Sequence, residues 1–337
     1  MEKSLPYIMN AAIADGFGTP DVLKIRQIPL PKLRPTDVLV KVISAGINRA
    51  EILWREGKYG SNPGFGDCDE IIGLEIAGIV VDFGDQVKDI HIGQLVMGLV
   101  GGGGYAQYAR MDYRLCMDVP ENINAIEAGG IPECMITAHQ MLMHLGKMKK
   151  GERVLIHGAG GGVGTSMIQM AKEAGASWIG ATASKGKHEK LKALGVDFTI
   201  DYTCESFKEI VHNESPGGKV DIIICNMGGS YFENNIFSLD NFGRLIQLGL
   251  QDGNYGKIPI DLVLRNCLSI HGSVMKSQTI HEKQAMTKRF TDRWMSSLKD
   301  GKIKPIIDEF YPLNEVVDAH IHFQNEKPFG KIILNCV

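Results

Sequence analysis

The spacing of hydrophobic residues changes along the chain. Over the first ~130 residues, short apolar segments alternate with polar positions, and Val38, Val40 and Val42 fall on one face of the segment 37–44, as in a half-buried strand. Further short apolar segments next to glycine turns lie at 75–84, 94–100 and 104–111. The pattern predicts a β-rich N-terminal part.

From about residue 133 onward, apolar runs alternate with helical patterns. Met167, Ile168 and Ala171 follow helical spacing up to Gly175, and a short charged helix is expected before Gly195. Buried strands separated by short helices form parallel βαβ units, so these runs predict a six-stranded doubly wound sheet. The six predicted strands are 154–157, 178–182, 198–200, 221–226, 244–249 and 268–274.

The end of the chain predicts an amphipathic helix within 277–303, a shorter second helix and a closing strand at 330–335. A length of 337 residues exceeds the roughly 250–300 residues over which a single core usually grows. We therefore expect two domains, a β-rich one built from 1–132 and 274–337 and a sheet domain built from 133–273.

A dense glycine run at 158–164, GAGGGVG, follows the first predicted strand of the sheet and opens the first helix. The strict dinucleotide pattern G-x-G-x-x-G would place Ala159 at its first glycine, but the looser spacing of Gly158, Gly161 and Gly164 is present. The unpaired amides at the start of a helix and the positive end of its dipole favour a pyrophosphate.

We expect Gly161 and Gly162 to let a phosphate approach the backbone, and Gly164 to let the helix pack close to the sheet. The alternative is a tight strand-to-helix turn that binds nothing. The predicted cofactor contacts of this run are Gly158, Gly161, Gly162, Val163 and Gly164.

The end of the second predicted strand indicates which dinucleotide binds. Sites that prefer NAD carry an acidic residue there, whereas this chain has Ala183 and Ser184, followed by Lys185 and Lys187. A serine and a lysine can bind a 2′-phosphate through charge-assisted hydrogen bonds, which favours NADPH. Alternatively, the lysines are solvated residues at a helix start. Tyr202 follows the third strand and could flank the adenine or the phosphate, or be a half-buried tyrosine at a strand end.

Composition and charge exclude several classes of protein. The net charge of -3 and the lack of a basic block give no indication of nucleic acid or anionic membrane as a partner. No apolar run approaches the ~18 residues of a membrane span, and the N-terminus lacks a signal-peptide pattern. The odd number of cysteines and the absence of C-x-x-C spacing predict reduced thiols and a cytoplasmic protein. The seven are Cys68, Cys116, Cys134, Cys204, Cys225, Cys267 and Cys336.

Eight segments occur in this order along the chain: AGINRAEILWREGKYG, GLEIAGIV, GGGGYAQYARM, IPECMITAHQML, VLIHGAGGGVGTSMIQMAK, CNMGGSYFENN, DNFGRLIQLGL and FGKIILN. Together they resemble the medium-chain dehydrogenase/reductase superfamily, and more narrowly its zinc-free quinone oxidoreductase branch, which includes zeta-crystallin. Two of them, INRAEILWREGKY and GGSYFENN, are most similar to the p53-inducible type of quinone reductase. The resemblance implies a Rossmann doubly wound parallel sheet inserted into a GroES-like β-rich domain, and a homodimer.

The same comparison predicts that no metal is bound. The zinc alcohol dehydrogenases of this superfamily have a Cys where this chain has Asn48, a His where it has Leu74, and a third ligand near Glu133. Asparagine and leucine cannot replace a thiolate and an imidazole around Zn²⁺. His320 and His322 are separated by two positions on a predicted helix, so their side chains diverge, and we expect surface histidines.

Without a metal, neutral hydrogen-bond donors must stabilise the charge that develops on the acceptor. The resemblance places Asn48 and Tyr59 near the nicotinamide as candidate catalytic residues, with Thr137 beside it. Asn48 could instead be a turn or helix-capping residue, and Tyr59 could only line the cleft. Further cofactor contacts are expected after the fourth and fifth strands, where ligand loops gather, and at a loosely aligned basic position: Asn226, Met227, Leu248, Gly249, Leu250 and Lys327.

The sequence thus predicts a zinc-independent NADPH:quinone oxidoreductase, because a quinone becomes aromatic on reduction and needs little acid catalysis. One alternative is an NADPH-dependent reductase of activated alkenes such as enones, enals or enoyl thioesters. A second is an NADPH-binding protein without catalytic activity.

Overall fold

The computed structural model describes residues 5–59 and 71–337 and divides the chain into two compact units. Unit 1 comprises Met1–Ile136, Lys276–Gly301 and Pro305–Val337, and unit 2 comprises Thr137–Met275 with Lys302–Lys304. The sequence placed these boundaries at 132/133 and 273/274. Cys68 lies outside the described residues.

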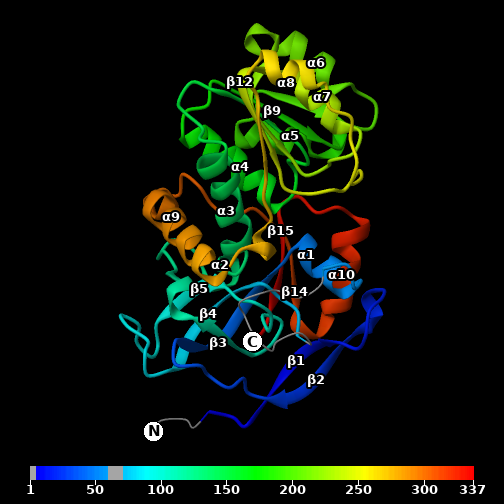
Figure 1. Cartoon of the computed structure of the whole chain (residues 1–337). Coiled ribbons are helices and arrows are strands. Elements are labelled where there is room, and N and C mark those ends of the chain that lie inside the picture. The colour runs from blue at the N-terminus through cyan, green and yellow to red at the C-terminus, as the bar shows by residue number, and fades with distance from the viewer. Residues whose placement is uncertain (1–4, 60–70) are drawn as a thin grey trace. The chain divides into compact units, whose positions relative to one another are not determined.

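Unit 2 contains a six-stranded parallel sheet in the order β10-β9-β8-β11-β12-β13 (Figure 1). The strand order reverses direction at β8, which is the arrangement of a doubly wound Rossmann fold. This confirms the predicted fold class and the six predicted strands. The strands are β8 (Arg153–Ile156), β9 (Trp178–Ala183), β10 (Phe198–Asp201), β11 (Val220–Cys225), β12 (Leu239–Gln247) and β13 (Ser269–Gly272).

Helices connect these strands. In α4 (Gly162–Glu173), Met167, Ile168 and Ala171 are buried, as their spacing predicts. The next helix, α5 (His188–Leu194), ends at Gly195, whose φ of 105° places it in the left-handed conformation common after helices. Helix α4 contacts α5, and α6 contacts α7. The remaining helices of this part are α6 (Phe207–Glu214), α7 (Tyr231–Ser238) and α8 (Ile260–Arg265).

Unit 1 is built on a mixed, mostly antiparallel seven-stranded sheet in the order β14-β15-β3-β4-β5-β7, with β6 paired to β3. Its central strand buries Leu39 as well as Val38, Val40 and Val42, so both of its faces are covered over this stretch. The sheet strands are β3 (Asp37–Ile47), β4 (Glu75–Phe83), β5 (Leu95–Leu99), β6 (Tyr108–Asp112), β7 (Cys116–Asp118), β14 (Ile307–Pro312) and β15 (Lys331–Asn335); β1 (Ile8–Ala14) and β2 (Leu23–Pro29) pair separately.

Among the residues that the structure describes in this part of the chain, five α-helices lie in unit 1 or begin there. Two were predicted, α9 (Ile280–Lys299) and α10 (Val316–Asn325). The others are α1 (Arg49–Arg55), α2 (Ala125–Ala128) and α3 (Pro132–His139), which continues as a π-helix over Gln140–Leu145. Within the described ranges, no helix is both long and apolar enough to cross a bilayer.

Candidate functional site

The glycine run forms the turn between β8 and α4, in unit 2. Gly158 has a φ of 63°, a left-handed conformation that favours glycine. Ala159 is fully buried, has no positive φ, and its amide donates to the Thr182 carbonyl at 3.0 Å. The alanine in this position is therefore compatible with the turn.

The glycines of the turn differ in what a side chain would meet. A Cβ on Gly164 would lie 2.5 Å from the Ala159 carbonyl oxygen, and a Cβ on Gly158 would lie 2.4 Å from Asn226 Nδ2. A Cβ on Gly161 would meet nothing within 4 Å. Gly158 and Gly164 are thus required by packing, whereas Gly161 borders open space at the start of α4.

The residues around this open space fit a dinucleotide phosphate. Gly161 is the N-cap of the 12-residue helix α4 and supplies no side chain to its first amides. Asn226 Oδ1, beside Gly158, is buried and has no hydrogen-bond partner among the described residues. A buried polar atom without a partner is costly, so it indicates a place for a bound group.

The loops after β11 and β12 meet at Asn226. Its carbonyl accepts the Gln251 amide at 3.2 Å, and a Cβ on Gly249 would lie 2.7 Å from the same oxygen. The Leu248 amide donates to the Cys225 carbonyl at 2.9 Å, while Leu250 is 56% exposed. The structure brings these predicted residues together at the carboxyl ends of neighbouring strands.

The end of β9 places a lysine over the glycine turn. A Cβ on Gly160 would lie 2.5 Å from Lys187 Cδ, so this side chain crosses the backbone of the run. Ser184 is half-buried and precedes the turn of 3-10 helix Lys185–Lys187, in which Lys185 is exposed. The sequence did not single out Gly160.

Two further groups lie at the end of β10. Tyr202 is 37% exposed directly after β10. Asp201 is directed into its own turn, where its carboxylate accepts the Thr203 amide at 3.0 Å and the Thr203 hydroxyl at 2.7 Å. The hydrogen bond from the Thr203 side chain lowers the pKa of Asp201.

A buried histidine at the end of β8, missed by the sequence analysis, supports the turn. His157 Nε2 lies 2.8 Å from Asn235 Oδ1, and Nδ1 lies 3.2 Å from Thr182 Oγ1, which also accepts the Gly158 amide at 3.2 Å. Burial lowers the pKa of His157 to about 4, so the ring is neutral at physiological pH. The sequence feature that could have revealed this residue is a histidine at the end of an apolar strand, in VLIH.

In unit 1, Asn48 is the N-cap of α1. Its amide donates to Glu51 Oε2 at 2.8 Å, and its Nδ2 lies 2.9 Å from Glu75 Oε1 and 3.3 Å from Glu51 Oε1. Its Oδ1 accepts from Lys331 Nζ at 2.6 Å. Asn48 thus takes part in a capping box at the start of α1, as the helix-capping alternative predicts. The side-chain NH₂ group of Asn48 faces the carboxylates of Glu51 and Glu75. A direct catalytic role for Asn48 stays a prediction.

Asn48 belongs to a larger set of buried polar contacts around two carboxylates. Lys331 Nζ donates to Glu75 Oε1 at 2.6 Å and to the Ile47 carbonyl at 2.8 Å. Glu75 Oε2 accepts the Glu133 amide at 2.8 Å, and Glu51 Oε1 accepts the Leu74 amide at 3.1 Å. We call Glu51, Glu75, Glu133, Lys283 and Lys331 the buried charge cluster.

Burial shifts the protonation of this cluster. It raises the pKa of Glu51 to about 7 and that of Glu133, which also lies near Glu75 and Glu51, to about 8. Burial lowers the pKa of Lys283 to about 8. The sequence analysis considered Glu133 only as a metal-ligand position and missed the other four. The sequence feature that could have revealed Glu75 and Lys331 is a charged residue within an apolar strand, in GLEIAGIV and GKIILN.

Tyr59 is packed between a ring and a cation. It is 9% exposed, stacks on Trp54 with ring centroids 5.9 Å apart, and has Lys276 Nζ 4.5 Å from its ring centroid. Burial, with Glu133 and Glu51 nearby, raises its pKa well above the ordinary value. The phenol therefore stays protonated and is able to donate a hydrogen bond.

The remaining predicted residues lie in different environments. Thr137 is 7% exposed in α3, and Met227 packs against the core of the sheet in unit 2. Val163 and Gly162 are half-buried in the first turn of α4. Lys327 is an exposed residue of unit 1 with a φ of 52°. Their contacts with a cofactor stay predictions.

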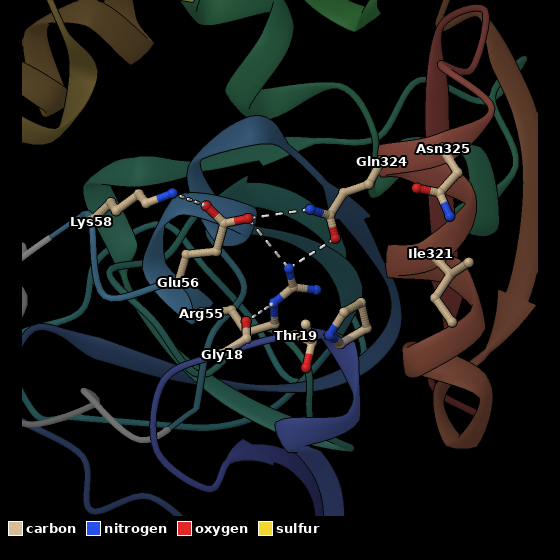
Figure 2. A pocket seen from close by; sticks show the side chains of 9 residues that line it. Gly18, Thr19, Arg55, Glu56, Lys58, Ile321, Gln324 and Asn325 are labelled. Carbon is tan, nitrogen blue, oxygen red and sulfur yellow. Dashed lines mark hydrogen bonds and ion pairs between the residues drawn. The ribbon is translucent and has the colours of Figure 1, made fainter.

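A cavity of about 510 Å³ lies in unit 1 beside Arg55, which is only 1% exposed (Figure 2). Arg55 Nη2 donates to Gln324 Oε1 at 2.8 Å, and Nε donates to the Gly18 carbonyl at 3.1 Å. The Glu56 carboxylate accepts hydrogen bonds from Lys58 Nζ at 2.9 Å and from Gln324 Nε2 at 3.2 Å. These hydrogen bonds link α1 to α10 and to the segment at Gly18.

The prediction that His320 and His322 are surface histidines is wrong. His320 is fully buried, with Nδ1 3.4 Å from Arg55 Nη1, and burial followed by Arg55 lowers its pKa to about 3. The side chain of His322 is 12% exposed, and its Nδ1 lies 3.0 Å from the Tyr311 hydroxyl. The two side chains contact different elements, because His320 meets Arg55 of α1 and His322 meets Tyr311 and Asp308 of β14.

One member of the cluster, Glu133, stands at a position where the resemblance places a metal ligand in zinc enzymes. Within residues 5–59 and 71–337, no three His, Cys, Asp or Glu side chains form a group that could hold a metal ion. At the predicted ligand positions, Asn48 and Glu133 take part in the contacts described above, and Leu74 is 3% exposed.

Comparison with known proteins identifies relatives over nearly the whole chain. Two family models match, "Alcohol dehydrogenase GroES-like domain" over residues 34–121 and "Zinc-binding dehydrogenase" over 162–292. The chain is 29% identical to a synaptic vesicle membrane protein VAT-1 homolog of Danio rerio, over 97% of this chain and 70% of that protein. It is 28% identical to a 2-methylene-furan-3-one reductase of Solanum lycopersicum, over 98% and 80%.

Several of the relatives carry quinone oxidoreductase names. Quinone oxidoreductase-like protein 2 of Bos taurus is 29% identical, over 93% of this chain and 89% of that protein. The structure of a quinone oxidoreductase from Coxiella burnetii superimposes with a TM-score of 0.79 at 28% identity, over 97% of this chain and 99% of the other. Proteins of the zinc-binding dehydrogenase family bind nicotinamide cofactors. With its GroES-like and Rossmann parts and these relatives, the chain belongs to the medium-chain dehydrogenase/reductase superfamily of oxidoreductases, in its quinone oxidoreductase-like branch.

Proposed function

We propose that this protein is a zinc-independent oxidoreductase that uses NADPH to reduce a quinone. The observation that carries the cofactor assignment is the glycine turn, with open space at Gly161, an unpartnered Asn226 Oδ1 and the Lys187 side chain across it. When bound, NADPH supplies a hydride, which is a proton with an electron pair. The proposed contacts are those predicted from the sequence, with the pyrophosphate at the start of α4.

The preference for NADPH rests on charge at the end of β9. Ser184 stands where NAD-preferring sites have an acid, and Asp201 at the end of β10 is engaged by Thr203. Lys187 supplies a positive charge beside the phosphate-binding turn. A 2′-phosphate placed there gains a charge-assisted contact that NADH cannot make.

Replacing Lys187 by alanine is therefore expected to weaken NADPH binding by roughly 10- to 100-fold and NADH binding by about twofold or less. Lys185→Ala removes the same charge from an exposed neighbouring position and is the matched control. The dissociation constants can be measured by the change in nicotinamide fluorescence. Equal losses for the two nucleotides in Lys187→Ala would argue against the phosphate assignment.

On the acceptor side, we propose that unit 1 provides a protonated phenol, Tyr59, and the buried charge cluster. Burial keeps the Tyr59 hydroxyl protonated, so it can donate to an oxygen that gains negative charge. A quinone suits such neutral donors, because its reduction to an aromatic product requires little polarisation. We assign Asn48 to positioning, since its amide hydrogens face Glu51 and Glu75.

A second candidate function is the NADPH-dependent reduction of activated alkenes. It is favoured by the similarity to the 2-methylene-furan-3-one reductase of tomato, whose named substrate is a conjugated enone. Rates with a quinone and with a 2-enal separate the two functions. An inert quinone with rapid turnover of the enal would favour the second.

We also propose that the protein is a cytoplasmic homodimer. Strand β13 is an edge of the sheet in unit 2, and its four residues are exposed. Nearby apolar side chains are exposed as well, with Ile260 at 71% and Leu264 at 76%. An exposed edge strand with exposed apolar side chains in the preceding helix α8 is a ready surface for pairing with a second copy. A monomeric mass by light scattering at micromolar concentration would argue against the dimer.

A further inference from the structure

We propose that Thr182 and His157 are positioning residues of the cofactor site, which hold the glycine turn in the form that a dinucleotide phosphate can approach. Neither residue belongs to the cofactor contacts proposed above, and both are buried, at 1% and 3% exposed. The proposal rests on the proposed function for its ligand and on contacts within unit 2 for its geometry.

Thr182, near the end of β9, holds two successive amides of the glycine turn. Its Oγ1 accepts the Gly158 amide at 3.2 Å, and its carbonyl accepts the Ala159 amide at 3.0 Å. Glycine adopts positive and negative φ about equally well, so the φ of 63° at Gly158 depends on such contacts. Because these two amides are directed at β9, the phosphate is left to the amides of Gly162 and Val163, which open α4 and have no intrahelical partner.

The imidazole of His157 fixes the direction of the Thr182 hydroxyl. His157 Nε2 lies 2.8 Å from Asn235 Oδ1, which can only accept a hydrogen bond, so Nε2 carries the ring proton. Burial lowers the pKa of His157 to about 4, so the ring is neutral and Nδ1 is an acceptor. Thr182 Oγ1, 3.2 Å from Nδ1, donates its proton to Nδ1 and keeps its lone pairs for the Gly158 amide. A continuous chain of hydrogen bonds thus runs from α7 to the turn.

The His157 ring is held by the helices that follow two neighbouring strands. Its centroid lies 4.6 Å from that of Phe207, which opens α6 after β10, and 5.1 Å from that of Tyr231, which opens α7 after β11. Both contacts are edge-to-face. The predicted cofactor contacts Tyr202 and Asn226 lie in the segments that lead to these helices. One buried ring therefore connects the turn to the end of β9 and to the segments that follow β10 and β11.

The two positioning residues act on the pyrophosphate end of the site, which NADPH and NADH share. Thr182→Val keeps the shape of the side chain but leaves the Gly158 amide without its acceptor. We expect it to weaken NADPH and NADH binding alike, by roughly 3- to 10-fold, whereas Lys187→Ala should discriminate between the two nucleotides. The matched control is Thr199→Val, which removes the hydroxyl of another buried threonine, 8% exposed in the adjoining strand β10, and should change neither dissociation constant by more than about twofold.

Conservative variants separate positioning from packing. Thr182→Ser keeps the hydroxyl and should retain the wild-type affinity for both nucleotides to within about twofold. His157→Asn places an amide near the position of Nδ1 and should bind both nucleotides more tightly than His157→Leu, which offers Thr182 no polar partner. The proposal would be overturned if Thr182→Val bound both nucleotides as the wild type does, if Thr182→Ser bound as weakly as Thr182→Val, or if the two His157 variants bound equally well.

The hydrogen-bond chain can also be observed without a nucleotide, by NMR of the whole chain labelled with nitrogen-15. The imidazole shifts of His157 should be those of the Nε2–H tautomer, and the Nδ1 shift should change in Thr182→Val. The Gly158 amide should exchange with solvent about tenfold faster in Thr182→Val than in the wild type or Thr199→Val. An Nδ1–H tautomer in the wild type, or unchanged exchange at Gly158, would overturn the proposal. If the wild type bound neither nucleotide, the proposed function would fail, and the NMR measurements alone would decide whether Thr182 and His157 hold the turn.

Discussion

Replacing Lys331 by methionine is expected to lower the free energy of unfolding of unit 1 by about 3–5 kcal/mol. The lysine is 3% exposed and donates to Glu75, Asn48 and the Ile47 carbonyl. Its loss leaves a buried carboxylate without its cation, and methionine cannot donate to the oxygens left behind. Denaturant titration followed by tryptophan fluorescence in a Trp178→Phe background reports on unit 1, because Trp54 and Trp294 both belong to it.

Two further variants separate charge from packing in this experiment. Lys288→Met breaks a surface pair with Asp292, in which the lysine side chain is 75% exposed, and should cost at most about 1 kcal/mol. Adding Glu75→Gln to Lys331→Met should recover part of the loss, because it removes the uncompensated charge. If Lys331→Met were as stable as Lys288→Met, the cluster would not be the buried ion pair described above.

A single methyl group at Gly161 is expected to weaken NADPH binding by roughly 10- to 100-fold, equivalent to about 1.4–2.7 kcal/mol. Gly161 has a φ of -91° and a ψ of 175°, which alanine adopts readily, and its Cβ would project into open space at the start of α4. The methyl group would occupy the place where a phosphate must approach the backbone. Calorimetric titration with NADPH measures the effect.

Gly164→Ala is the matched comparison for this methyl group. Its Cβ would lie 2.5 Å from the Ala159 carbonyl oxygen, a backbone atom that cannot move aside easily, so we expect a loss of about 1–3 kcal/mol in the stability of unit 2. Gly161→Ala should change stability by less than about 1 kcal/mol. Unchanged NADPH affinity in Gly161→Ala would show that no phosphate approaches this residue.

The parts of the fold that rest on local periodicity could be predicted from the sequence. The six strands of unit 2 are continuous apolar runs, and the rule for βαβ units converts them into a doubly wound sheet. Two elements gave no such signal. Strand β14 alternates poorly and is half exposed, and the helical stretch Pro132–His139 with Gln140–Leu145 is buried nearly all round, so neither shows a clear amphipathic period.

The candidate site also has one part that could be predicted from the sequence and one part that could not. The glycine turn is contiguous in sequence, so its residues and their spacing could be recognised before the structure was known. The buried charge cluster combines α1, β4, α3, α9 and β15, and Lys331 is separated from Glu75 by 256 residues. The burial of His320 depends likewise on Arg55, which is 265 residues away. Such contacts arise from tertiary packing, which local patterns do not encode.

The most direct test of the proposed function is a panel of electron acceptors assayed with NADPH on full-length protein whose zinc content has been determined by elemental analysis. We predict that zinc is absent in stoichiometric amount and that quinones are reduced with kcat/KM values well above those of 2-enals and enoyl thioesters. NADPH that binds tightly but is oxidised by no acceptor, or a quinone reductase activity that requires bound zinc, would contradict the proposal.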